Sequence, residues 1–126
     1  MLLLVCGLTA AHAHHSDAVY DYEAIVAFDA EVVRYVWRNP HVTIFVETED
    51  ETGEKFEWEI ESGSTPIMIR SGWSQNLLDT GQAVTIRAHP MRSGQPKAIL
   101  NTLETTDGRL WGQVEGVAEV TVAASS

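Results

Sequence analysis

The sequence predicts an all-β domain with one short helix, folded as a small OB-like Greek-key β-barrel. Five segments alternate apolar and polar residues with a period of two, which is the period of a half-buried strand. A helix signal lies between the third and the fourth of these segments, and this order of elements is that of an OB-fold. A β-sandwich is the alternative, although it would need about seven strands and no central helix.

The first three strands are expected between residues 25 and 61. Residues 25–37 are rich in Val, Phe, Tyr and Trp and predict one long, bent strand, which ends at Asn39-Pro40 because proline has no N–H to donate. Residues 41–48 alternate cleanly, and a turn at residues 51–54 joins them to the third strand. We expect this hairpin to bury one face, formed by Val42, Ile44, Val46, Phe56, Trp58 and Ile60.

A helix is expected directly after the hairpin. Ser64-Thr65-Pro66 indicates its start, with a hydroxyl cap and a proline in the first turn, and Gly72 indicates its end. Residues 83–88 alternate again and predict the fourth strand.

The fifth strand is expected at residues 98–105, with Ile99 and Leu103 facing the core. Asp107-Gly108 is typical of a tight hairpin turn, so Leu110-Trp111 is expected to add a short edge strand.

The first thirteen residues predict a signal peptide. An apolar run is followed by small residues at Ala11 and Ala13, the spacing that signal peptidase requires. The run has no Lys or Arg before it, which a start codon upstream of Met1 would explain. Export would remove Cys6, the one cysteine, and would place the protein in the periplasm or outside the cell.

The remaining chain has the length of one ordinary domain. We expect residues 14–114 to form that domain, with an N-terminal arm at residues 14–22. Residues 115–126, rich in Ala, Val, Thr and Ser, are expected to form a loose tail.

The charge of the chain disfavours a nucleic-acid partner, and the length of its apolar N-terminal stretch disfavours a membrane span. Eighteen acidic against eight basic residues give a formal charge of −10, and no basic stripe is present. Nucleic acids are bound through Lys and Arg that displace counterions from phosphate, so a nucleic-acid partner is not expected. The apolar stretch at the N-terminus is shorter than the ~20 residues that a membrane span needs.

Several motifs resemble those of a known family of small exported bacterial proteins, which is catalogued only as a domain of unknown function. The motifs that carry the resemblance are His14-His15-Ser16, Tyr20-Asp21, Trp37-Arg38-Asn39-Pro40-His41-Val42, Trp58-Glu59-Ile60-Glu61, Gly72-Trp73 and Asp107-Gly108-Arg109. The H-H-S start and the W-x-N-P-H string are the most specific of them. The resemblance implies export and a β-rich fold, and it supplies no activity.

The histidines fit either a copper site or a structural role, in which His14 and His15 are solvent-exposed remnants of processing and His41 caps a turn or packs beside Trp37. Cleavage after Ala13 would leave His14 with a free α-amine and an imidazole, which together chelate one metal ion. His15 adds a second imidazole, and His41 is the candidate ligand from the barrel. Nitrogen-rich sites of this kind suit Cu(II) best. Asp21 or Glu61 is expected to orient a ligating ring through a hydrogen bond.

Three functions remain open from the sequence. The first is an exported copper-binding accessory protein that sequesters or delivers the ion. The second is a metal-free periplasmic module that binds a peptide, a glycan or a partner protein through exposed Trp and Tyr. The third is a copper-dependent oxidase, although no catalytic residue is predicted and His89, just before Pro90, is interpreted as structural.

Overall fold

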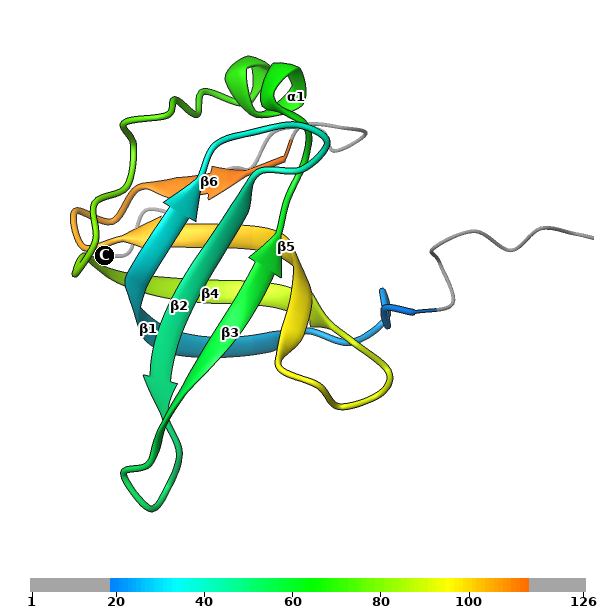
Figure 1. The fold of residues 1–126 in the computed structure, drawn as a ribbon, viewed down its shortest axis with the longest axis vertical. Helices are drawn as coiled ribbons and strands as arrows, with labels where there is room; N and C mark the ends of the chain where they lie inside the picture. The colour runs from blue at the N-terminus through cyan, green and yellow to red at the C-terminus, as the bar shows by residue number, and fades with distance from the viewer. Residues whose placement is uncertain (1–18, 114–126) are drawn as a thin grey trace, which may run out of the picture.

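The structure is a computed structural model, and it describes residues 19–113. The elements along the chain are β1 (Val26–Val36), β2 (Thr43–Glu49), β3 (Lys55–Glu61), α1 (Thr65–Arg70), β4 (Ala83–Pro90), β5 (Lys97–Thr105) and β6 (Leu110–Gly112). All five predicted main strands, the helix and the short edge strand are therefore present (Figure 1).

The sheet closes into a five-stranded barrel with one extra strand. Its order is β3-β2-β1-β4-β5-β6, and a parallel pairing of β3 with β5 joins the two ends of the barrel. The remaining pairs are antiparallel. This closure confirms the predicted OB-like barrel. The alternative, a β-sandwich, is not observed, because a sandwich has two separate sheets that face each other.

Two β-bulges let the strands curve around the barrel. In β1 the register passes from Val32↔Val46 to Arg34↔Phe45, which leaves Val33 as the extra residue. In β5 the partners of Arg87 and Ala88 are Thr102 and Leu100, so one residue of β5 is unpaired there.

The bulge in β5 corrects one sequence prediction. Leu100 and Leu103 are both buried although they are three residues apart, whereas Ile99 is only half-buried. Strict alternation predicted Ile99 and Leu103 on the core face, and the Ile99 half of that prediction is wrong. The unpaired residue shifts the phase between the two halves of the strand.

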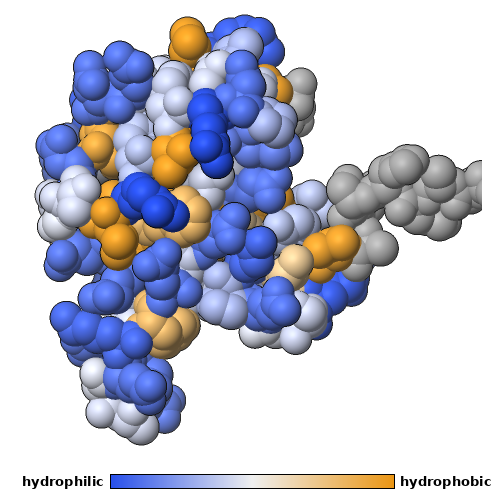
Figure 2. All heavy atoms as spheres, in the orientation of Figure 1, coloured by the Kyte–Doolittle hydropathy of each residue, from blue (hydrophilic) through white to orange (hydrophobic). Residues whose placement is uncertain are grey.

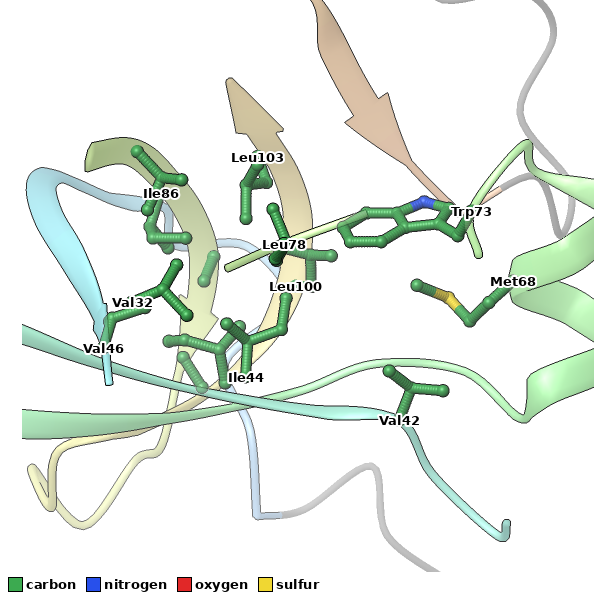
Figure 3. Close-up of a cluster of buried hydrophobic side chains, with 14 residues drawn as sticks. Val32, Val42, Ile44, Val46, Met68, Trp73, Leu78, Ile86, Leu100 and Leu103 are labelled. Atoms are coloured by element: carbon green, nitrogen blue, oxygen red, sulfur yellow. The ribbon is translucent and has the colours of Figure 1, made fainter. Parts of the chain in front are cut away.

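The core is formed by side chains from the strands of the barrel and from α1. Ile44, Ile60, Ile86 and Leu103 come from four different strands and have no exposed surface. Met68 extends from α1 toward Val42 and Trp73, so the helix covers one end of the barrel (Figure 3). Burial of this apolar surface provides the main driving force for folding.

The hairpin of β2 and β3 has the predicted phase. Ile60 is fully buried, and Glu57, on the opposite face, is exposed. Burial decreases toward the hairpin tip, because Trp58 is half-buried and Phe56 is 38% exposed. The tip projects beyond the rest of the barrel (Figure 1), and the Trp58 ring lies 5.1 Å from that of Phe28 and 6.4 Å from that of Phe56.

The helix start differs from its prediction in one respect. Ser64 is the N-cap residue and Pro66 lies in the first turn, but the Ser64 side chain makes no capping hydrogen bond. The backbone N–H of Thr65 instead donates to Asn39 Oδ1 over 2.9 Å. The turn that precedes His41 is therefore tied to α1. Gly72 has a φ of 90°, as its predicted place at the helix end requires.

The helices of the described region are too short to cross a bilayer. Within residues 19–113, no helix has the length and apolar character of a membrane span.

Candidate metal centre

His41 lies beside the end of β3 because of the hairpin register. Thr43 pairs with Glu61, and the ladder continues past the strand ends through Val42, whose N–H donates to Gly63 O over 2.8 Å. His41 precedes Thr43 by two residues and therefore lies on the same face as Glu61. The imidazole is 52% exposed, and the Glu61 side chain is 29% exposed.

The two ring nitrogens of His41 face two different oxygens. Nδ1 lies 3.1 Å from the carbonyl oxygen of Ser62, and Nε2 lies 3.3 Å from Glu61 Oε1. A carbonyl only accepts hydrogen bonds, so the contact with Ser62 favours a proton on Nδ1. In the neutral ring the lone pair is then on Nε2, the nitrogen beside the carboxylate.

A protonated ring would form an ion pair with this carboxylate, whereas a neutral ring would offer a metal cation a lone pair and a carboxylate oxygen side by side. Two ligands that each lie about 2.0–2.2 Å from one metal ion are roughly 3 Å apart. The separation of 3.3 Å between His41 Nε2 and Glu61 Oε1 is close to that value. The pair therefore supplies one nitrogen and one oxygen donor to a common position at the barrel surface.

Glu61 lies beside Nε2 of His41, and its role as an orienting residue stays a prediction. As an orienting residue it would accept a hydrogen bond from the ring nitrogen that does not bind metal. Here the carbonyl of Ser62 takes that place, and Glu61 stands beside Nε2, the nitrogen available for binding. Oε1 of Glu61 thus lies 3.3 Å from the nitrogen on which a neutral ring would carry its lone pair.

Tyr20 holds the second oxygen of the same carboxylate. Its hydroxyl donates to Glu61 Oε2 over 3.3 Å, and the residue is 9% exposed. Burial, and after it the negative charge of Glu61, raises the pKa of Tyr20 to about 12. The side chain therefore stays a neutral phenol that fixes Glu61. Tyr20 is among the residues of the family resemblance, but nothing near it in sequence indicates a partner 41 residues away.

Asp21 is engaged elsewhere. Its Oδ1 accepts the N–H of Glu23 over 3.1 Å and lies 3.9 Å from the Arg92 guanidinium. Within the described part of the chain no hydrogen bond or ion pair given by the structure joins Asp21 to His41. Of the predicted site residues that the structure describes, His41 and Glu61 are brought together and Asp21 is not.

His14 and His15 lie outside the described residues, and so does the predicted signal peptide. Among residues 19–113 no group of three or more His, Cys, Asp and Glu side chains is placed to hold a metal ion. A complete site would need further ligands. Six residues separate His14 from Tyr20, and an extended chain of that length spans at most about 20 Å. Because Tyr20 touches Glu61, that reach includes the His41–Glu61 pair.

The contact between Tyr20 and Glu61 makes stability depend on alkaline pH. The folded state raises the pKa of Tyr20 from its ordinary 10.0 to about 12, so it favours the protonated phenol. The stability that the protonated Tyr20 contributes is fully present below pH 10 and is lost as the pH rises from 10 toward 12. Urea unfolding between pH 8 and pH 11.5 should show a steeper alkaline decline for the wild type than for Tyr20→Phe, and parallel declines would contradict this contact.

The surface depressions of the barrel lie away from this pair. One of them has a volume of about 550 Å³ and lies between β1 and the turn end of the β2–β3 hairpin, with Phe28, Glu31, Glu47 and Lys55 among its lining residues. The face over β1, β2 and β3 is mostly hydrophilic, with scattered apolar side chains (Figure 2). None of the four tryptophans is exposed, and Trp73 is buried. The described surface thus offers no tryptophan platform for a sugar or a peptide.

Comparison with known proteins gives one family. The profile of a family described as "Family of unknown function (DUF6152)" matches residues 3–100. A search of curated proteins finds no match.

Proposed function

Because the chain belongs to this family of unknown function, whose description names no activity, we propose a function from its own residues. The protein is an exported copper-binding accessory protein that works in the periplasm or outside the cell. It holds one Cu(II) ion between its N-terminal histidines and the barrel. The ligands are the α-amine and ring of His14, the ring of His15, His41 Nε2 and Glu61 Oε1.

The observation that carries this proposal is the pairing of His41 with Glu61. Nδ1 is held by a backbone carbonyl 3.1 Å away, and Nε2 faces a carboxylate oxygen at 3.3 Å. Ligating histidines in proteins almost always donate their other N–H to a carbonyl or carboxylate. The half-exposed ring lets an ion reach Nε2 from solvent.

The choice of Cu(II) follows from the donor set. Three imidazoles, one amine and one carboxylate are mainly nitrogen donors of intermediate softness. Affinity for such ligands rises along the first-row divalent metals to a maximum at copper. Every one of these ligands must be unprotonated to bind, so affinity should decrease as the pH falls.

The accessory role follows from the access to the ion. A site at the surface of a small barrel, with its ligands shared between the barrel and a terminal arm, can take up and release an ion without opening a core. Storage and delivery need only this, and no catalytic residue is required.

Affinity measurements on the processed protein and three variants test the proposal. We expect the processed protein to bind one Cu(II), and His41→Ala to bind it about 10- to 100-fold more weakly in competition with a chelator. Glu61→Gln should also weaken binding, because an amide is a poorer ligand than a carboxylate. Glu57→Gln is the matched control, since it removes the same charge from the same face of β3 and should leave affinity unchanged.

Two results would contradict this assignment. Equal affinities for His41→Ala and the wild type would show that the barrel takes no part. Equal losses for Glu57→Gln and Glu61→Gln would show that net charge alone matters. Failure of the processed protein to bind copper would favour a metal-free binding module.

A further inference from the structure

A short ribbon forms where the N-terminal arm runs antiparallel to the end of β4. Tyr20 forms an isolated bridge with Met91, Asp21 N–H donates to Pro90 O over 2.8 Å, and Arg92 N–H donates to Val19 O over 2.8 Å. If this register continues, Tyr22 stands opposite His89, and the rings of these two residues lie 5.3 Å apart. Met91 and His89 are two residues apart, so they lie on one face of the ribbon together with Tyr20 and Tyr22.

His89 has the same hydrogen-bond arrangement as His41. Its Nδ1 lies 2.9 Å from the carbonyl oxygen of Ala24, so the proton is on Nδ1 and the lone pair is on Nε2. Every buried side-chain nitrogen and oxygen among residues 19–113 has a hydrogen-bond partner. Among residues 19–113 the structure gives no hydrogen-bond partner for His89 Nε2, and the residue is half-buried.

Met91 lies two residues beyond His89 on the same face of the ribbon, and its side chain carries a thioether. Two residues of an extended chain are about 6.6 Å apart, a distance that a His and a Met side chain on the same face can close. Met91 is half-buried, whereas Met68 is fully buried in the core. Within the described chain Met91 is thus the methionine that an ion from solvent can reach.

We propose that His89 Nε2 and Met91 Sδ form a second site, which binds a soft monovalent ion, Cu(I). Thioether sulfur selects Cu(I) over the harder divalent metals, and one imidazole with one thioether can form a two-coordinate site. This site shares no ligand with the proposed Cu(II) site. Tyr20 stands between the two, because it pairs with Met91 and donates to Glu61. The protein would thus accept copper supplied in either oxidation state, with no electron transfer of its own.

The direct test follows methionine methyl groups by NMR. The processed protein is labelled with ¹³C in its methionine methyl groups and titrated with Ag(I), which resembles Cu(I) and is not oxidised in air. We expect the Met91 methyl signal to shift as Ag(I) is added and to stop shifting at one equivalent of Ag(I). The Met68 signal should stay in place. An unmoved Met91 signal, or equal shifts of both signals, would overturn the proposal.

Affinity for Cu(I) itself provides the second measurement. In anaerobic competition with a Cu(I) chelator, Met91→Leu and His89→Gln should each bind at least about tenfold more weakly than the wild type. Met68→Leu is the matched control and should bind as the wild type does. Wild-type Cu(I) affinity in both site variants would contradict the assignment. Their Cu(II) affinity should not change, so the failure of one copper site can be told from the failure of the other.

Discussion

Replacing Ile60 with alanine should lower the free energy of unfolding by about 2–5 kcal/mol. Ile60 has no exposed surface and stands opposite Ile44, which is buried to the same extent. It also lies in the part of β3 that pairs with Ala98 of β5, where the barrel closes. The substitution removes buried methyl and methylene groups and leaves a cavity that rigid neighbouring strands cannot fill. Urea unfolding followed by tryptophan fluorescence would measure the loss.

Glu57→Ala is the control for this loss. Glu57 lies on the same strand, three residues away, with its side chain exposed. Exposed substitutions of this kind change stability by at most about 0.5 kcal/mol. Equal losses for Ile60→Ala and Glu57→Ala would show that the assigned faces of the β2–β3 hairpin are wrong.

Blocking the α-amine of His14 should weaken Cu(II) binding by about 100-fold or more. Acetylation removes the lone pair that the amine donates and leaves both imidazoles of the arm in place. The chelate formed by amine and ring on one residue is then lost. The measurement compares the processed protein with the same protein made with an Nα-acetyl group, in chelator competition at one pH.

Folding and copper binding are separated within this experiment. The acetylated protein should unfold at the same urea concentration as the free one, since acetylation changes none of the residues 19–113 that form the described barrel. Equal copper affinity of the two proteins would remove His14 from the site. An intact mass that includes residues 1–13 in the exported protein would contradict the predicted cleavage itself.

Local patterns were enough to predict most of the fold. The alternation in β2 and β3 identifies the buried face, because each strand has one face toward the core and pairs with its neighbour in simple register. Long-range packing determines the rest. The extra residue in β5 is a response to the closure of the barrel, so strict alternation placed Ile99 on the wrong face. The cap of α1 comes from Asn39, 26 residues away from Thr65, which no local rule could identify.

The candidate site divides in the same way. His41 and Glu61 could be chosen from the sequence because both lie at the hairpin end, on one face. Their chemical roles depend on which ring nitrogen meets which oxygen, and only the three-dimensional arrangement gives that. Tyr20 was not predicted at all, because its position depends on the bridge between the arm and Met91.

The central claim is that one copper ion joins the N-terminal arm to the barrel at His41 and Glu61. Cu(II) is paramagnetic and broadens the NMR signals of nuclei close to it. In the ¹H–¹⁵N spectrum of the processed protein, substoichiometric Cu(II) should broaden the amide signals of Tyr20, His41 and Ser62. The signals of residues 50–54, at the far end of the β2–β3 hairpin, should stay sharp, because seven strand residues span about 23 Å. Broadening confined to residues before Val19, or no broadening at all, would contradict the claim.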